Sequence, residues 1–481
     1  MDIQNEKKHL AEAFFQSLMK KTSHAPLVDY GLPGPFICSR KKLLILSVKL
    51  GLHLRKNSHS QRIGIILPPG LAGTIANLAV LFAGKIPVNL NFSLGSNIAE
   101  NLIQKAEIKT IISATKMMNK FPDFPWTDDL FEISTWLQKI SLTPYRLIKE
   151  AVLLQFPYQL ARFFLKIPSK IDSEEATLLF TSGSSGEPKG VVLTHQNILS
   201  NCAQINRLGL FDKDAKILAN LPLFHSFGFT VSTCFPLLYD IPFVTVPSPL
   251  DVKSGLHAIQ KEKITFLLGT PTFLRGFLNK GKKEDFESIR YVVAGAEKTE
   301  SSFKKKWEEF ANCSYLEGYG LTETSPGISF NLPKEGSREG SVGHLFSDIE
   351  CKTIHPETRE DLQVGESGLL CFRGPNIFSG YLNDLEKTNE VLTKENWFVT
   401  GDIGYLDQDD FLFIKGRLSR FSKIGGEMVP HETIEARIKQ ILFGNGENEA
   451  SLLIIGKSDE NKGEQLILVI DQEIDFPKLR K

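Results

Sequence analysis

The feature that most constrains this chain is a loop rich in glycine and hydroxyl residues that follows an apolar, strand-like run. Residues 178–190 read LLFTSGSSGEPKG. Small residues let backbone N–H groups crowd round a phosphate, hydroxyl groups add hydrogen-bond donors, and Lys189 adds a positive charge. The glycine spacing is not that of a P-loop and no Ser or Thr follows Lys189, which argues against a kinase or a P-loop ATPase. The stretch predicts a loop that binds the phosphates of a nucleoside triphosphate.

Length and composition are those of a globular protein with several domains. A chain of 481 residues is too long for one ordinary hydrophobic core, so two or three domains are expected. Its 42% hydrophobic and 23% charged residues are typical of a soluble globular protein. The 56 lysines and arginines balance 56 aspartates and glutamates, and this balance predicts no nucleic-acid partner.

The cysteines and the N-terminus indicate a cytoplasmic protein. The six cysteines are scattered and form no CxxC pair, so we expect reduced, mostly buried thiols and no structural zinc site. Residues 1–8 lack the apolar segment of a signal peptide. Two uncharged stretches, 63–84 and 217–239, are interrupted by prolines and glycines, which favours buried α/β core over membrane spans.

Apolar runs alternate with helical patterns along the first two thirds of the chain. Strands are expected at residues 62–67, 86–89, 110–112, 264–268 and 289–293. A helical pattern at 71–82 lies between the first two, which predicts βαβ units and a parallel sheet covered by helices. From residue 341 onward short strands and turn residues predict a smaller β-rich subdomain, at about 341–415.

The segment 145–168 has a different character from the rest. Large apolar residues are interleaved with basic ones, and Glu150 is its only acid. A basic amphipathic helix, kinked at Pro157, is typical of peripheral contact with a membrane interface. The alternative is an ordinary helix that packs on the domain or connects it to the strand that follows.

Four further stretches complete a recognisable set with the phosphate loop. They read LPLFHSFG at 221–228, EGYGLTET at 317–324, WFVTGDIG at 397–404, and GRLSRFSKIGGE at 416–427. In this order and at these distances they resemble the motifs of the adenylate-forming (AMP-binding, acyl-CoA synthetase-like) superfamily, over roughly residues 10–470. The resemblance implies an α/β fold with a large N-terminal domain, residues 1–415, of βαβ parallel sheets plus the small β subdomain. A short, incomplete, mobile α+β domain, residues 416–481, would follow.

The resemblance also implies which residues act, with ATP and Mg²⁺ as cofactors. The catalytic candidates are Thr181, Lys189, His225, Glu323 and Arg417. The nucleotide-binding candidates are Ser182, Gly183, Ser184, Ser185, Gly186, Gly295, Tyr319, Gly320, Thr322, Asp402 and Lys423. The chemistry agrees: Glu323 is a hard oxygen ligand suited to Mg²⁺, Tyr319 offers a flat face for adenine, and Asp402 can accept from the ribose hydroxyls.

Each of these side chains also has an ordinary structural interpretation. Glu323 is a candidate helix-start carboxylate, and Asp402 is a candidate turn residue after Gly401. His225 lies between two phenylalanines, so it is either a satisfied core histidine or a gate to the acyl pocket. The motifs together favour the functional interpretation for Thr181, Glu323 and Asp402, because consistency across a set is stronger than any single match.

The acid is expected to be a fatty acid. No carboxylate occurs between residues 221 and 230, where relatives that activate amino acids carry an aspartate for the substrate ammonium. The absence indicates an acid without an amine, and 34 phenylalanines permit an apolar pocket.

The hinge indicates the acceptor. Arg420 stands at the pivot where most of the family has an acidic residue. The stretch RFSKIGGEMV at 420–429 resembles the acyl–acyl-carrier-protein synthetase branch, which often works with a 2-acylglycerophosphoethanolamine acyltransferase. This implies an acyl carrier protein as acceptor, at the inner membrane face. A fatty acyl-CoA synthetase is the alternative.

One departure from the family pattern concerns a lysine. Family members use a Lys in a Gly-Lys turn near the C-terminus during adenylation, and here Gly456-Lys457 is expected in a mid-domain loop instead. The small domain therefore looks cut short. Loss of such a cation can cost about 10²–10³ in rate, so we expect slow or absent adenylation. A catalytically impaired protein that binds ATP and acyl groups is the alternative from another class.

Overall fold

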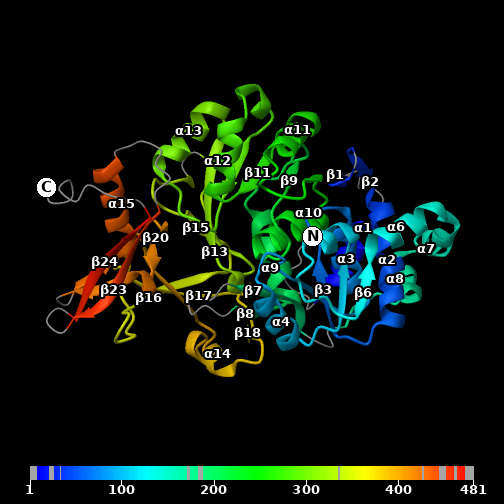
Figure 1. The fold of residues 1–481 in the computed structure, drawn as a ribbon, viewed down its shortest axis with the longest axis horizontal. Coiled ribbons are helices and arrows are strands. Elements are labelled where there is room, and N and C mark those ends of the chain that lie inside the picture. Colours follow the sequence, from blue (N-terminus) through cyan, green and yellow to red (C-terminus); the bar gives the residue numbers. More distant parts are fainter. Residues whose placement is uncertain are drawn as a thin grey trace. The chain divides into compact units, whose positions relative to one another are not determined.

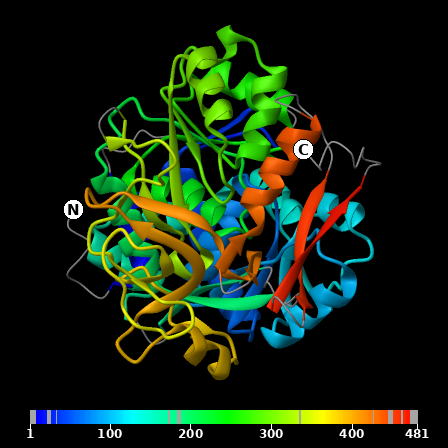
Figure 2. The same ribbon diagram turned by 90° about the vertical axis from the view of Figure 1, so that its left-hand side faces the viewer.

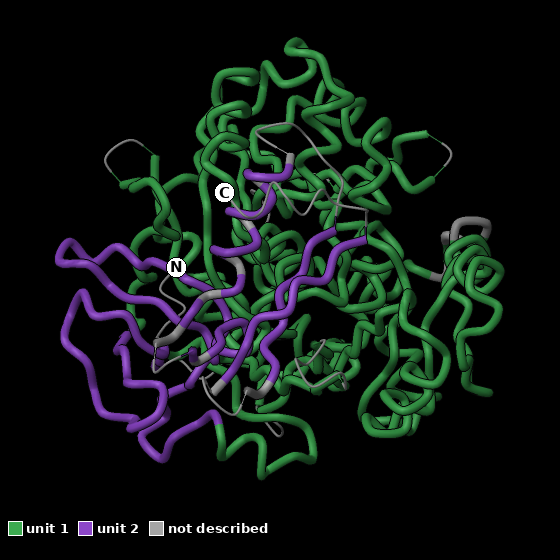
Figure 3. The backbone as a smooth tube through the Cα atoms, turned by 60° about the vertical axis from the view of Figure 1, so that its left-hand side comes forward, with its two compact units in different colours: residues 1–349, 374–390 green, residues 350–373, 391–481 purple. Residues whose placement is uncertain are grey.

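The computed structural model separates the chain into two compact units. Unit 1 holds residues 1–349 and 374–390, and unit 2 holds residues 350–373 and 391–481 (Figure 3). The structure describes residues 8–20, 27–32, 34–170, 174–181, 188–333, 336–424, 427–443, 451–459 and 463–471. Each unit is considered by itself below.

The first sheet of unit 1 has nine described strands, in the order β15-β14-β13-β12-β11-β9-β10-β1-β2. Their bounds are β1 Leu27–Asp29, β2 Phe36–Cys38, β9 Ile217–Ala219, β10 Phe243–Thr245, β11 Phe266–Gly269, β12 Tyr291–Ala294, β13 Ser314–Gly320, β14 Gly327–Phe330 and β15 His344–Leu345. Strands β13, β12, β11, β9, β10 and β1 run parallel. The helices α11 (Val252–Glu262), α12 (Pro271–Lys280) and α13 (Ser301–Ala311) share one apolar core with these strands, as expected for βαβ units.

The second sheet of unit 1 has seven described strands, in the order β18-β8-β7-β4-β3-β5-β6. Their bounds are β3 Arg62–Ile66, β4 Ile86–Asn89, β5 Thr110–Ser113, β6 Asp129–Glu132, β7 Glu175–Thr181, β8 Lys189–Thr194 and β18 Gly380–Tyr381. The five strands from β7 to β6 are parallel, and β8 and β18 extend the sheet antiparallel at the β7 edge. The core beneath it joins apolar residues of β3, β4 and β5 with those of α4 (Ser96–Lys105).

The other described helices surround these two sheets (Figure 1). They are α1 Leu10–Leu18, α2 Arg40–Asn57, α3 Leu71–Phe82, α5 Thr115–Lys120, α6 Ile133–Leu142, α7 Ile148–Leu153, α8 Tyr158–Leu165, α9 His195–Arg207, α10 Phe235–Tyr239 and α14 Leu385–Val391. Short 3₁₀ turns are η1 Pro144–Leu147, η3 Lys283–Phe286 and η4 Thr322–Thr324, and η2 Phe227–Cys234 is a π-helix.

Unit 2 contains two small four-stranded sheets within its described residues, in the orders β16-β17-β19-β20 and β22-β21-β24-β23. The strands are β16 Glu350–Ile354, β17 Gly368–Arg373, β19 Phe398–Leu406, β20 Leu412–Arg417, β21 Phe421–Ile424, β22 Glu427–Pro430, β23 Leu452–Asp459 and β24 Gly463–Ile470. The turn η6 (Leu418–Arg420) and helix α15 (His431–Phe443) complete the unit. Figure 2 shows the long β23–β24 hairpin in red and α15 in orange.

The α/β fold predicted from the sequence is confirmed. Helix α3 and strand β4 have the predicted bounds, whereas β11 and β12 each begin two residues later than expected. Helix α3 is buried on almost every side, so a long apolar run marks it in the sequence. Apolar runs show where an element lies, but they fix its first and last residues less sharply. The two uncharged stretches hold β3 with α3, and β9 with η2 and α10. No described helix is long and apolar enough to cross a bilayer.

The thiols and the 145–168 segment can be compared with expectation in the same way. All six cysteines are free, and four are buried, as predicted. The single kinked helix expected over 145–168 is wrong: η1, α7 and α8 are separate, and Pro157 is the N-cap of α8. A proline cannot donate the helical hydrogen bond and disfavours helical geometry in the residue before it, so the helix ends rather than bends.

Candidate active site

The phosphate loop connects the two strands of a hairpin. Strands β7 and β8 are antiparallel, and Thr181 pairs directly with Lys189 across the hairpin. The loop candidates Ser182, Gly183, Ser184, Ser185 and Gly186 lie outside the described residues. Thr181 and Lys189 are half-buried at the two ends of the loop. The hairpin therefore places a hydroxyl and an ammonium group at the mouth of this loop.

A tyrosine that the sequence analysis did not identify connects Lys189 to Glu323. The Nζ atom of Lys189 lies 5.1 Å from the centroid of the Tyr381 ring, within range for a cation–π contact. The hydroxyl of Tyr381 donates a 2.9 Å hydrogen bond to Oε1 of Glu323. Strand β18 holds the tyrosine against β8, with Tyr381 opposite Val191. A cation, an aromatic hydroxyl and a carboxylate thus meet beside the loop.

Two buried asparagines fix the segment that carries Tyr381. The side-chain amide of Asn197, on α9, donates to the carbonyls of Pro375 at 2.9 Å and Ile377 at 2.7 Å. The amide of Asn376 donates to the carbonyls of Thr324 at 2.7 Å and Gly327 at 2.9 Å. Buried backbone carbonyls need such partners, so these amides hold the tyrosine strand and the Glu323 turn in one arrangement.

Glu323 lies in the 3₁₀ turn η4, directly after β13. Its own carbonyl accepts a 2.8 Å hydrogen bond from the N–H of Phe378. Its carboxylate is half-buried, and one oxygen is occupied by the Tyr381 hydroxyl. The helix-start interpretation and the functional one are compatible here, because the short turn orients the carboxylate toward β18 and β8.

The remaining candidates of this unit lie at the carboxyl ends of parallel strands. Tyr319, Gly320 and Thr322 follow one another at the end of β13, and Gly295 follows β12. A Cβ atom on Gly320 would lie 1.9 Å from the carbonyl oxygen of Pro326, so only glycine fits this approach. A Cβ on Gly295 would meet Gly318 at an ordinary 3.5 Å. Ligands of open α/β sheets bind at this end of the strands.

The His225 segment leads into the π-helix η2. A Cβ atom on Gly228 would lie 2.1 Å from the carbonyl oxygen of Pro222, so this glycine allows the chain to fold back on itself. The N–H of Phe229 bonds to the carbonyl of His225 at 2.8 Å. Sequence periodicity did not reveal the π-helix, a geometry that often occurs at functional sites.

His225 is not a core histidine. Its side chain is exposed, and its ring lies 4.7 Å from that of Phe224, with the two planes tilted by 50°. The surrounding atoms nevertheless desolvate the imidazole enough to lower the pKa of His225 below its usual value. The lowered pKa favours the neutral form of the ring. The exposure of the side chain excludes the core interpretation, and the role of pocket gate stays a prediction.

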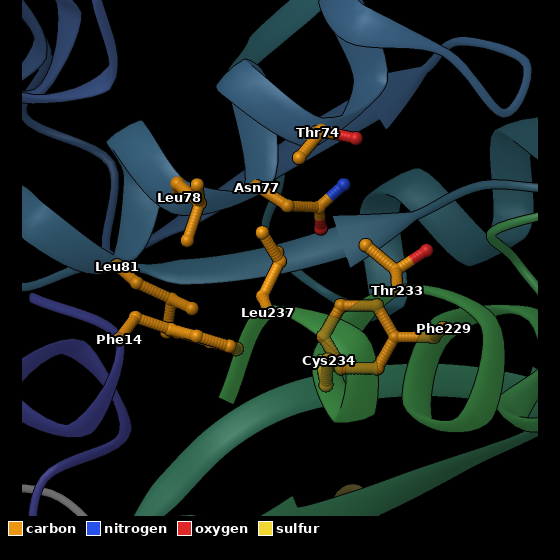
Figure 4. A pocket seen from close by; sticks show the side chains of 9 residues that line it. All are labelled: Phe14, Thr74, Asn77, Leu78, Leu81, Phe229, Thr233, Cys234 and Leu237. Atoms are coloured by element: carbon orange, nitrogen blue, oxygen red, sulfur yellow. The ribbon is translucent and has the colours of Figure 1, made fainter. Parts of the chain in front are cut away.

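A small apolar cavity lies beside η2. Figure 4 shows side chains of α1, α3, η2 and α10 around it. Its lining residues are Phe14, Thr74, Asn77, Leu78, Leu81, Phe229, Thr233, Cys234 and Leu237. Charged side chains do not occur among these nine residues, but the cavity of about 10 Å³ has room for no more than one water molecule, so it is a packing gap rather than an acyl pocket.

Unit 2 holds Asp402 and Arg417 as a direct ion pair. Asp402 on β19 lies opposite Arg417 on β20, and Nε of Arg417 lies 2.7 Å from Oδ1 of Asp402. The aspartate is buried, whereas half of the arginine side chain is exposed. The N–H of Asp402 donates to the hydroxyl of Thr400 at 3.0 Å. Asp402 therefore lies within a strand, and the turn interpretation is wrong.

The hinge residues also fall in unit 2. Lys423 is on β21, but its side chain lies outside the described part. Arg420 donates to the carboxylate of Glu435 and, at 3.0 Å, to the carbonyl of Ile454, so the pivot arginine is tied to α15 and β23. Lys457 is on strand β23 opposite Gln465, and the expected mid-domain loop there is wrong because the β23–β24 pairing continues through it.

Tyr381 is the one residue of this arrangement that the sequence analysis missed. The signal was present, since the tyrosine follows a glycine in the stretch NIFSGYLN at 376–383. Gly380 has φ +139, and a Cβ there would lie 2.8 Å from the side chain of Thr388. Because Gly380 is required by both the backbone and the packing, it indicates that the next residue, Tyr381, has a fixed position. The partners of Tyr381 lie far away in the sequence, so they could not be identified from it.

Comparisons with known proteins found related sequences and a similar fold. The family described as AMP-binding enzyme matches residues 39–382. A probable CoA ligase of Humulus lupulus is 33% identical over 279 residues, which are 56% of this chain and 50% of that protein. The long-chain-fatty-acid–CoA ligase of Bacillus subtilis (strain 168) is 29% identical over 452 residues, which are 88% of this chain and 79% of that protein.

Among solved structures, O-succinylbenzoate coenzyme A synthetase from Bacillus subtilis, in complex with ATP and magnesium ion, has a similar fold. The TM-score is 0.77 at 21% sequence identity, over 97% of this chain and 90% of that one. At this identity the likeness shows the fold alone.

Proposed function

Since this chain belongs to the AMP-binding enzyme family, we propose that it activates a long-chain fatty acid with ATP and transfers the acyl group to the thiol of acyl carrier protein. In the first half-reaction a carboxylate oxygen of the acid attacks the α-phosphorus of ATP. The bond from that phosphorus to the bridging oxygen breaks, and the electron pair leaves with pyrophosphate. In the second, a thiolate attacks the acyl carbon and AMP leaves.

The observation that carries the proposal is the contact chain Lys189–Tyr381–Glu323. Lys189 over the tyrosine ring and the hydroxyl on Glu323 place a cation and a carboxylate on either side of one aromatic residue, at the mouth of the predicted phosphate loop. Catalysis of phosphoryl chemistry is mainly positioning and electrostatics. In this proposal Thr181 and Lys189 hold the phosphates.

Glu323 fits a magnesium ion that arrives with the nucleotide. Clusters of three metal-ligating side chains are absent from the residues that the structure describes. Mg²⁺ usually takes one or two carboxylates, with phosphate oxygens and waters as its other ligands. Glu323 has a half-buried carboxylate with one oxygen bonded to Tyr381, which matches that requirement. When bound, the ion would neutralise phosphate charge.

Each unit supplies candidate residues for the nucleoside. In this proposal Tyr319 faces the adenine, Gly320 and Gly295 leave room for it, and the Thr322 hydroxyl supports the α-phosphate. Asp402 accepts from the ribose hydroxyls while Arg417 orients it, and Lys423 contributes a second cation. The 2.7 Å pair between Asp402 and Arg417 supports this role, because the guanidinium fixes the position of a carboxylate that can accept further hydrogen bonds.

The name of one curated relative supports a fatty acid as substrate, since the Bacillus protein is named as a long-chain-fatty-acid ligase. The cavity beside η2 is apolar but too small to hold an acyl chain. A neutral His225 at the start of η2 suits a gate that admits a hydrocarbon tail.

The acceptor and the location are finer points of the proposal. Arg420 and the stretch that follows it support acyl carrier protein, whereas the names of the curated relatives support CoA as the alternative. We also propose that residues 145–168 make peripheral contact with the cytoplasmic face of a membrane, where fatty acids partition.

The first test is fatty-acid-dependent exchange of labelled pyrophosphate into ATP, with Mg²⁺ and the full chain. Exchange stimulated by a long-chain acid is the result that this proposal predicts, in contrast to the slow or absent adenylation expected from the sequence, and an amino acid should give none. ATP binding without exchange would overturn the proposed ligase. It would favour instead the impaired nucleotide-binding protein considered from the sequence.

The second test separates the acceptors. Holo acyl carrier protein and CoA are supplied in separate reactions with the same labelled acid. Acylation of the carrier protein is expected. Acylation of CoA alone would overturn the carrier-protein part of the proposal and leave the adenylation intact.

A further inference from the structure

An unusual group of large apolar side chains is exposed on η1, α7, α8 and the turn between the two helices. Phe163 is 73% exposed, Tyr145 63% and Ile148 59%. We call this group the α7–α8 surface; its members are Tyr145, Ile148, Val152, Phe156, Leu160, Phe163 and Phe164. Contiguous exposed apolar groups of this kind mark interaction sites on folded proteins. Figure 1 shows α6, α7 and α8 beside α2, at one end of unit 1.

Each of the two helices turns some polar side chains inward, toward α1 and α2. Glu150 is 1% exposed and accepts a 3.0 Å bond from Nζ of Lys49 on α2. On α8, Tyr158 donates a 2.7 Å hydrogen bond to Glu12 of α1, and Arg162 pairs with the same carboxylate at 3.6 Å. These bonds hold both helices in one orientation.

Helical spacing then accounts for the exposed face. With about 100° per residue, Ile148 and Val152 lie on the side of α7 opposite Glu150. Leu160, Phe163 and Phe164 share one stripe of α8, whereas Ala161 and Leu165 are buried on the other. The apolar stripe faces solvent because the polar anchors fix the rotation of each helix, so the exposure is built into the fold.

The exposed aromatic rings form a cluster across the turn at Pro157. The ring centroids of Phe163 and Phe164 are 5.6 Å apart, and those of Phe156 and Phe164 are 6.4 Å apart. Rings at these distances pack edge-to-face or tilted. The cluster therefore presents a compact apolar wedge between the ends of two short helices.

The charge around the wedge has one sign. Lys149, Lys166 and Lys170 are exposed beside it, and Lys139 is exposed on α6. Between residues 133 and 170 the only acid is Glu150, which is buried and paired. An apolar wedge surrounded by exposed lysines complements a surface that is apolar inside and negative outside.

We propose that the α7–α8 surface inserts into the interface of an anionic phospholipid bilayer, with the phenylalanines at the acyl boundary and the lysines at the headgroups. A second copy of this chain is a poorer occupant, because a symmetric contact would bring the same lysines together. This surface specifies how the membrane contact of the proposed function is made. It rests on that function only in taking the membrane as the source of the fatty acid.

Vesicle flotation tests it with the full chain and without any catalytic readout. Wild-type protein is mixed with phosphatidylcholine vesicles, alone or with about one third phosphatidylglycerol to supply negative charge. We expect flotation with the anionic vesicles, little with the neutral ones, and a decrease at high salt.

Two sets of variants have matched controls. Phe156→Ser, Phe163→Ser and Phe164→Ser together should reduce partitioning about tenfold or more, whereas Leu250→Ser, Val364→Ser and Leu385→Ser remove equally exposed apolar groups elsewhere and should not. Lys149→Glu, Lys166→Glu and Lys170→Glu together should also reduce it about tenfold or more. Their control is Lys253→Glu, Lys261→Glu and Lys280→Glu, at exposed positions on α11 and α12.

Unchanged thermal unfolding would show that a variant is folded. Absence of wild-type flotation, or equal losses in test and control variants, would overturn the proposal. So would a wild-type dimer in sedimentation that only the phenylalanine variant converts to monomer, since the occupant would then be a second copy. Failure of pyrophosphate exchange with intact flotation would overturn only the ligase proposal.

Discussion

The two units arrange their charged candidate residues in opposite ways. In unit 2 the charges are joined directly, since Asp402 and Arg417 lie opposite each other on neighbouring strands with 2.7 Å between charged atoms. In unit 1 the charges are separated, because the Tyr381 ring and hydroxyl lie between Lys189 and Glu323.

The two arrangements suit different tasks in the handling of a nucleotide. A direct ion pair has already neutralised its charges, so it serves best to fix the position of an acceptor. Charges kept apart by an aromatic residue retain their fields for a ligand, which is what phosphates and their metal ion require. We therefore expect chemistry to depend more on unit 1 and nucleotide affinity more on unit 2.

The largest effect is expected from Glu323→Gln. The amide keeps the shape and accepts from Tyr381 but loses the charge that suits Mg²⁺, so pyrophosphate exchange should fall by about 10²–10³. Exchange at saturating Mg²⁺ measures it. The control is Glu386→Gln, at an exposed carboxylate on α14. Activity above one tenth of wild type would contradict the metal role.

A smaller and different effect is expected from Asp402→Asn. The carboxylate is buried beside Arg417, and hydrogen bonds to charged acceptors contribute about 1.5–3 kcal/mol. The KM for ATP should therefore rise by roughly 10–100-fold, with a smaller change in kcat. Asp410→Asn, at an exposed turn, is the control. A loss in kcat alone would contradict the expectation that unit 2 serves nucleotide affinity and unit 1 serves chemistry.

Tyr381→Phe tests whether the hydroxyl of the tyrosine orients Glu323. The variant keeps the ring beneath Lys189 and removes only the hydroxyl that bonds to Glu323. We expect about a tenfold loss of kcat, from one hydrogen bond to a charged group, with little change in the KM for ATP. If the KM for ATP changes instead, the tyrosine acts on nucleotide binding rather than on the orientation of Glu323.

The sequence predicted the fold and the types of residue in both units, for physical reasons. Helix α3 and strand β4 were predictable because buried elements carry long apolar runs. Thr181 and Lys189 were predictable as loop ends because a hairpin brings neighbours in sequence together. The roles of the site residues, and the domain boundary at 415, stay predictions.

The contacts of Tyr381 were not predictable from sequence. They join residues 189, 323 and 381, and such long-range pairing depends on how two sheet edges and η4 meet. The 145–168 segment forms two helices instead of the single kinked helix predicted from the sequence. The reason is local, because a proline inside a helix removes a hydrogen bond and clashes with the preceding turn, so the helix ends near Pro157. The exposed apolar faces of these helices depend on Glu12 and Lys49, which periodicity within the segment cannot reveal.

Asn197→Ala tests the support of unit 1 rather than its chemistry. It leaves the carbonyls of Pro375 and Ile377 without their amide partner, at a cost of about 1–3 kcal/mol. The first thermal unfolding transition should shift to lower temperature, with a modest loss of exchange activity. Asn206→Ala, at an exposed position on the same helix, should change neither. An unchanged transition would show that other contacts hold the tyrosine strand.

The smallest effect is expected from His225→Gln, and it appears only in pH dependence. Desolvation by neighbouring atoms lowers the pKa of His225 in the folded chain below the unfolded value of about 6.5. The unfolded chain therefore binds more protons in that window, and stability falls as the pH drops below about 6.5. The glutamine variant should lose less stability in denaturant titrations between pH values of about 7 and 5.5.

His257→Gln, at an exposed histidine, should keep the wild-type slope. Equal slopes for all three proteins would mean that His225 titrates freely in solvent, and the neutral gate in unit 1 would then have no physical basis.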